Sequence, residues 1–89
     1  MKMGKKEIVG RMNQLKDGDM LRFLLHPTFG GGMAIIRLNP NHPAKGQKKY
    51  EIKLGKDPAS AEQSSPYWSA DNPKDLAGWV ADRWGELVA

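Results

Sequence analysis

The sequence predicts a single small α+β domain, with elements in the order α-β-β-β-α. Two patterns predict these helices and strands. Residues 73–88 place apolar side chains at helical steps of three and four, and residues 19–54 contain three short apolar runs separated by turn residues. Strands joined by such short connections form an antiparallel meander. The third observation is length, because 89 residues leave no room for a second core, so residues 1–89 form one domain.

The first helix is predicted over residues 5–15. Ile8, Met12 and Leu15 make a short apolar stripe along it. Gly10 weakens the helix interior by roughly 1 kcal/mol relative to alanine. A helix this short and this weak depends on packing against the rest of the domain.

Strands are predicted over residues 19–26, 33–38 and 48–54, with Pro27 ending the first of them. Alternate side chains of a strand point to opposite faces of the sheet. The predicted core face consists of Leu21, Phe23, Leu25, Ala34, Ile36, Leu38, Tyr50, Ile52 and Leu54. The predicted opposite face consists of Arg22, Leu24, His26, Met33, Ile35, Arg37, Lys49, Glu51 and Lys53.

The last helix is predicted over residues 73–88, after a long loop over residues 55–71. Asn72 suits the N-cap and Pro73 the first helical position. The apolar stripe consists of Leu76, Trp79, Val80, Trp84, Leu87 and Val88. We expect this helix to lay its tryptophans across the core face, with the first helix beside it. The long loop is expected either to be mobile or to be held by its own side chains, with residues 66–68 pinning it to the domain.

Composition excludes several classes of protein. Apolar residues make up 39% of the chain and charged residues 27%, which is too apolar for a disordered chain. The absence of cysteine excludes disulfides and thiolate chemistry. The N-terminus has no apolar run of a secretory signal, and no stretch approaches a membrane span, so we expect a cytoplasmic protein without a membrane partner.

Charge is unevenly distributed along the chain. Residues 1–16 carry five basic side chains against one acidic, and residues 17–56 carry seven against three. Residues 57–89 carry two basic side chains against six acidic ones. The first two segments could attract a polyanion and the third would repel it. A mixed, solvated surface that keeps the protein soluble is the plainer interpretation.

The order of one helix, three antiparallel strands and a last helix resembles the double-stranded RNA-binding domain, which is similar in length. That family contacts RNA through the loop after its first strand and through a lysine cluster that opens its last helix. Here the loop reads His26-Pro-Thr-Phe-Gly-Gly-Gly32, without a Gly-Pro-x-His pattern, and Lys74 is the only basic residue where the last helix opens. The resemblance therefore implies an α-β-β-β-α sandwich and not membership of the family.

No constellation predicts catalysis, a metal site or a cofactor. His26 and His42 have no hydroxyl or carboxylate beside them at motif spacing, and nothing fixes their distance from Asp17 or Asp19. Residues 30–32 are three glycines without the spacing or lysine of a phosphate-binding loop, which favours a flexible hairpin tip. Phe29 at that tip could stack on a base, wedge into a partner or fold back on the core.

Two hypotheses of function follow, both of them non-enzymatic. The first is a small nucleic-acid-binding module that uses a basic sheet face. Its candidate residues are Arg22, Arg37, Lys45, Lys48, Lys49, Lys53 and Phe29. Against it, strand lysines also guard a sheet edge against unwanted pairing. The alternative is a protein-interaction or self-association domain, with contacts through Leu24, Met33 and Ile35 or through Tyr67 and Trp68.

Overall fold

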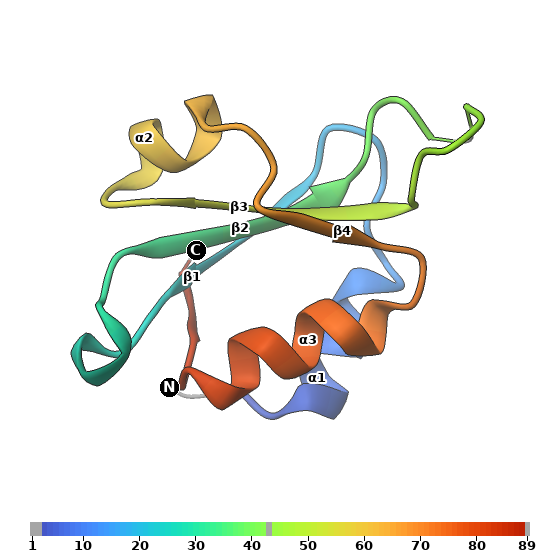
Figure 1. Ribbon diagram of the computed structural model, residues 1–89. Coiled ribbons are helices and arrows are strands. Elements are labelled where there is room, and N and C mark those ends of the chain that lie inside the picture. Colours follow the sequence, from blue (N-terminus) through green and yellow to red (C-terminus); the bar gives the residue numbers. More distant parts are fainter. Residues whose placement is uncertain (1–2, 43, 89) are drawn as a thin grey trace.

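The computed structural model describes residues 3–42 and 44–88 as a five-stranded antiparallel sheet with helices on both faces (Figure 1). The strands follow the order β4-β3-β2-β1-β5 across the sheet. The elements are α1 (Lys5–Met12), β1 (Met20–Leu24), the 3₁₀ turn η1 (Pro27–Phe29), β2 (Met33–Leu38), β3 (Tyr50–Gly55), α2 (Pro58–Gln63), β4 (Trp68–Ala70), α3 (Pro73–Asp82) and β5 (Glu86–Val88).

The predicted meander forms the centre of the sheet, and the predicted α+β class is confirmed. Ile36 of β2 lies opposite Leu21 of β1 and Ile52 of β3, so the inward side chains of the three strands share one face. All nine residues of the predicted core face lie in or against the main hydrophobic core. β1 is shorter than predicted, and β3 begins at Tyr50 rather than at residue 48.

Helices α1 and α3 lie side by side on the core face (Figure 1). Asn72 caps α3 as predicted, because its side-chain oxygen accepts a hydrogen bond of 3.0 Å from the Lys74 N–H. The predicted first helix was too long by three residues. The Leu15 N–H bonds to the Met12 carbonyl three residues back, so the chain tightens into a turn after Met12.

The prediction of a helix through residue 88 was wrong. α3 ends at Asp82, Trp84 adopts a left-handed conformation with φ 52°, and residues 86–88 pair with β1. Leu87 and Val88 fit the helical stripe, yet they also alternate as a strand does, with Leu87 packed against the core and Val88 against the opposite side. A short apolar run fits both the helical and the strand period, so periodicity alone could not distinguish a helix from a strand here.

The predicted loop over residues 55–71 contains two further elements, α2 and β4. Asp57 caps α2 and Pro58 occupies its first turn. β4 pairs with β3, and the Tyr67 N–H donates a 2.8 Å hydrogen bond to the Ile52 carbonyl. The expectation that residues 66–68 attach this segment to the domain is therefore confirmed. The segment is ordered by backbone pairing as well as by side chains.

Helix α2 covers part of the outer face, the side of the sheet opposite α1 and α3 (Figure 1). Met33, Ile35 and Ala61 form a second buried cluster there. Gly55 permits this approach, because a Cβ atom at residue 55 would lie 2.3 Å from the Ala61 nitrogen. The domain thus has three layers where α2 lies and two layers elsewhere.

Helices of the described residues are all too short or too polar to cross a membrane.

Candidate functional site

Three of the predicted basic residues share the outer face, but each is already engaged. The Arg22 guanidinium lies 3.1 Å from Glu62, and the Arg37 guanidinium lies 2.5 Å from Glu51. Lys53 is only 7% exposed, and its ammonium group donates a hydrogen bond to the Glu62 backbone carbonyl oxygen. An arginine or lysine held by a carboxylate or carbonyl presents much less positive potential to a polyanion. The outer face is therefore not an open cationic surface.

The partner of two of these residues comes from α2, which sequence reasoning missed. Glu62 lies on α2 and reaches both Arg22 and Lys53. The signal was present, because Asp57 followed by Pro58 is the usual start of a helix. The six-residue length of the helix left no apolar periodicity to support that start.

The remaining predicted lysines lie in the loop between β2 and β3. Lys45, Lys48 and Lys49 are all exposed. The Lys48 ammonium lies 3.7 Å from the Asp71 carboxylate. The Lys49 backbone N–H donates a hydrogen bond of 2.9 Å to the same carboxylate. The structure therefore divides the seven predicted nucleic-acid residues among the outer face, this loop and, for Phe29, the hairpin tip.

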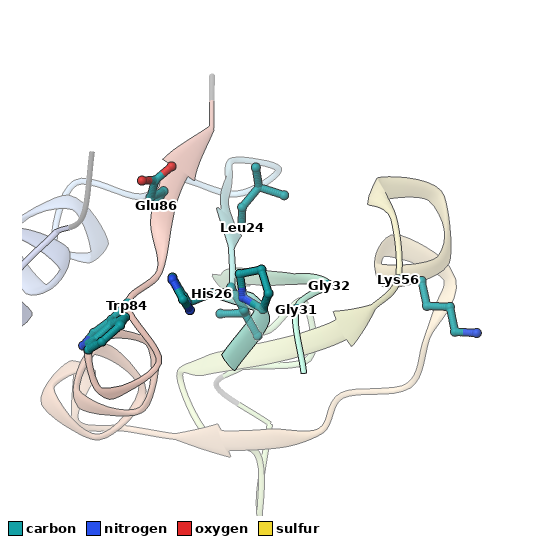
Figure 2. Close-up of a pocket in the computed structure, with 9 residues that line it drawn as sticks. Leu24, His26, Gly31, Gly32, Lys56, Trp84 and Glu86 are labelled. Atoms are coloured by element: carbon teal, nitrogen blue, oxygen red, sulfur yellow. The ribbon is translucent and has the colours of Figure 1, made fainter. Parts of the chain in front are cut away.

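A groove of about 380 Å³ opens at the hairpin end of the outer face, beyond α2 (Figure 2). We call it the Trp84 groove. Trp84 and Glu86 lie on one side, Lys56 lies on the other, and Leu24 and His26 lie between them (Figure 2). The lining residues are Leu24, Leu25, His26, Pro27, Gly31, Gly32, Lys56, Trp84 and Glu86.

Three rings pack together here, and two of them, His26 and Trp84, line the groove. Trp84 makes edge-to-face contacts with His26 at 4.9 Å and with Phe29 at 5.6 Å between ring centroids. His26 is fixed further, because its Nδ1 accepts a hydrogen bond of 3.1 Å from the Thr28 N–H at the start of η1. Phe29 is 44% exposed and Trp84 43%, so the rings pack on one another while keeping surface toward solvent. Phe29 thus joins an aromatic cluster that the sequence did not predict.

Trp84 occupies a backbone position that usually belongs to glycine. The Gly85 N–H bonds to the Val80 carbonyl and the Trp84 N–H to the Ala81 carbonyl, each at 3.1 Å, which is the Schellman pattern at a helix end. The left-handed residue of that motif is Trp84, at φ 52°, and the conformation costs a non-glycine residue roughly 1–2 kcal/mol. The fold therefore keeps a large, half-exposed indole at a strained position.

A second groove, of about 320 Å³, lies on the opposite side of the molecule's sheet, among α1, α3 and β4. We call it the Lys74 groove. Its lining residues are Lys5, Trp68, Lys74, Asp75, Gly78, Trp79, Asp82 and Arg83. An adjoining hollow of about 250 Å³ is lined by Lys5, Lys6, Val9 and Lys74, so Lys5 and Lys74 border both spaces.

No group of three metal-binding side chains comes together in residues 3–42 and 44–88. The backbone N–H of Ser60, which lies 2.8 Å from the Asp57 carboxylate, lowers the pKa of that group below its ordinary value of 3.8. This carboxylate caps α2 and borders neither groove, so its pKa reflects a structural role.

Comparisons with protein families, curated proteins and solved structures gave no match for this chain.

Proposed function

We propose that this chain is a non-enzymatic protein-interaction module that takes an apolar segment of a partner protein in the Trp84 groove. The observation that carries the proposal is Trp84 itself, a half-exposed indole held at a left-handed backbone position. Backbone strain of this kind persists where the surrounding structure over-determines it, often at binding sites. Glycine would adopt this backbone conformation without strain. A tryptophan at this position is therefore better explained by a role of its indole than by the backbone.

The chemistry of the groove suits a protein partner. Leu24 is 47% exposed and lines the groove together with His26 and Trp84, and the Phe29 ring packs on Trp84 beside it, so apolar surface gathers there. Tryptophan and other aromatic side chains are the residues that contribute most to protein interfaces. Lys56 and Glu86 place opposite charges on the two sides of the groove, which suits the polar rim of such an interface (Figure 2).

Preorganisation adds to the suitability of the site. The His26 ring is held by the Thr28 N–H, and the indole packs edge to face against His26 and Phe29, so both side chains are largely ordered before a partner arrives. Side-chain ordering at an interface costs about 0.5–1.5 kcal/mol for each flexible residue, and this groove avoids much of it. The nucleic-acid hypothesis for the outer face gains no comparable support, because Arg22, Arg37 and Lys53 are engaged within the domain.

The test is selection of peptides from a random displayed library against the immobilised protein. Enriched peptides should carry aromatic or large aliphatic residues and should bind in solution, measured by fluorescence anisotropy. The Trp84→Gly variant, which suits the left-handed backbone, should lose at least about tenfold in affinity, as removal of a central interface tryptophan usually does. Tyr67→Ala is the matched control, because Tyr67 is a more exposed aromatic residue outside the groove.

Equal binding of the selected peptides to the wild type and to Trp84→Gly would contradict the proposal. So would a library that yields no enriched peptide. Self-association through the same groove is checked separately by light scattering after gel filtration. A concentration-dependent mass that Trp84→Gly abolishes would identify the occupant as a second copy of this chain.

A further inference from the structure

We propose that the Lys74 groove binds single-stranded nucleic acid. A base would stack on the aromatic side chains of the groove, and adjacent phosphates would lie on Lys5, Lys6 and Lys74. This site is separate from the Trp84 groove and from the outer sheet face, since it lies among α1, α3 and β4.

Three lysines give this site a charge complementary to phosphate. Lys5 and Lys6 come from α1 and Lys74 from α3, and the packing of these helices brings the three side chains around one hollow. Within the described ranges, none of the three ammonium groups lies within ion-pair distance of a carboxylate. They differ in this respect from Arg22, Arg37 and Lys48, which do form ion pairs. Unpaired lysines are the groups that neutralise phosphates and release counterions.

Aromatic surface beside these lysines also supports the proposal. Trp68 is 40% exposed at the groove, and Tyr67 lies 5.8 Å from Trp79 between ring centroids. The Arg83 guanidinium lies 3.9 Å from the Trp79 centroid and donates a hydrogen bond of 3.0 Å to the Trp79 carbonyl, which holds it over the ring. Aromatic rings and guanidinium planes are the surfaces on which splayed bases stack.

Gly78 also favours a binding role for this groove, because neither the backbone conformation nor the core packing requires glycine at that position. It lies in the interior of α3, where glycine is the weakest helix former after proline. A Cβ atom at this position would meet only the end of the Lys5 side chain, with the nearest atom 3.5 Å away. The missing side chain instead leaves open the part of the groove between Lys5 and the helix surface.

The acidic residues of the groove define which nucleic acid fits. Asp75 and Asp82 line the same space and would repel phosphates that crossed it. One backbone can follow the lysine side and direct its bases toward Trp68 and Trp79. A duplex presents two charged backbones and keeps its bases stacked inside, so it would bring phosphates toward the carboxylates without offering a base face. The groove therefore favours a single strand.

The test uses fluorescence anisotropy with labelled single-stranded DNA, single-stranded RNA and duplex DNA of mixed sequence, about 12 nucleotides long, which is within the range of single-strand sites. Both single strands should bind better than the duplex, and the DNA and RNA arms show which sugar is preferred. With three lysines on phosphates, the slope of log affinity against log salt should be about −2 for single strands.

The decisive variant is Lys5→Glu combined with Lys74→Glu. Both positions lie in the first turn of a helix, where an acidic residue suits the helix dipole, which offsets the repulsion from Asp75 and Asp82, and urea denaturation checks that the variant is folded. Lys45→Glu combined with Lys49→Glu is the matched control, because it changes the net charge equally on the loop between β2 and β3. The first variant should abolish most of the salt-dependent affinity, and the control should bind within about twofold of the wild type.

Two single substitutions test the stacking. Trp68→Ala should weaken binding about fivefold or more, as loss of one stacked base usually does. Gly78→Ala should weaken binding while making the protein more resistant to urea, which separates loss of the groove from loss of the fold. The inference is overturned if the duplex binds best, if no nucleic acid binds at low salt, or if the two charge variants behave alike. Trp84→Gly should leave this binding unchanged, so the test is independent of the proposed function.

Discussion

Substitution of Gly55 by alanine should displace α2 from the outer face. The new Cβ atom would lie 2.3 Å from the Ala61 nitrogen, 2.6 Å from the Ala61 Cα and 2.7 Å from the Ser60 carbonyl carbon. All three are backbone atoms of α2, so no side-chain rotation relieves the overlap. Overpacking of this kind costs about 1–3 kcal/mol, and loss of the hydrogen bond from the Lys53 ammonium adds about 1.5–3 kcal/mol.

The free energy of unfolding should therefore fall by roughly 2.5–6 kcal/mol, measured by urea denaturation followed by circular dichroism. A shift of about 4–8 °C in Tm for each kcal/mol makes thermal denaturation a second measure. The same variant should expose Lys53, which is 7% accessible in the folded protein. Amine acetylation read by mass spectrometry should then modify Lys53 at a rate close to that of an exposed lysine.

Gly10→Ala is the control, since a Cβ atom at residue 10 meets nothing within 4 Å. Alanine in the interior of α1 should raise the free energy of unfolding by about 0.5–1 kcal/mol. A Gly55→Ala protein within about 0.5 kcal/mol of the wild type, with Lys53 still protected from acetylation, would refute the placement of α2 against β3.

Three further results are expected. Asn72→Ala should lower the free energy of unfolding in urea by about 1 kcal/mol, because the cap of α3 is lost. Arg37→Ala should lower it by roughly 3 kcal/mol, because it leaves the Glu51 carboxylate, 4% exposed, without its charge partner. The pKa of Asp57 is lowered in the folded state, so its stabilising effect is complete above the ordinary value of 3.8 and is lost as pH falls through the lower folded value. Urea midpoints between pH 7 and pH 3 should therefore fall less in an Asp57→Asn variant than in the wild type, because asparagine caps a helix without titrating.

The centre of the domain was predictable from the sequence because its signals are local and strong. Alternation across residues 50–54 and the cap at Asn72 each specify one structure, and both are confirmed. The stripe of α3 is confirmed only as far as Val80, whose side chain is fully buried. Beyond that point the helix end depends on the packing of Gly85, where a Cβ atom would lie 2.4 Å from a Val80 methyl group.

The outer elements were not predictable, since tertiary pairing determines them. β4 and β5 have three residues each, too few for a period, and they are strands because β3 and β1 have edges to pair with. The prediction of nucleic-acid-binding residues on the outer face assumed that this face is open, whereas α2 covers part of it. The two grooves combine residues distant in sequence, such as Leu24 with Trp84, so no motif spacing could reveal them.

The pairing of β5 with β1 also affects how the chain acquires its structure during synthesis. β1 meets β2 soon after both are made, whereas its other neighbour is residues 86–88, with Arg22 opposite Val88. Until those residues emerge, β1 is an open edge with unpaired backbone groups, and such edges recruit other chains. Nascent chains should thus stay prone to aggregation until β5 is made. Deletion of residues 86–88 should prolong that vulnerable state indefinitely.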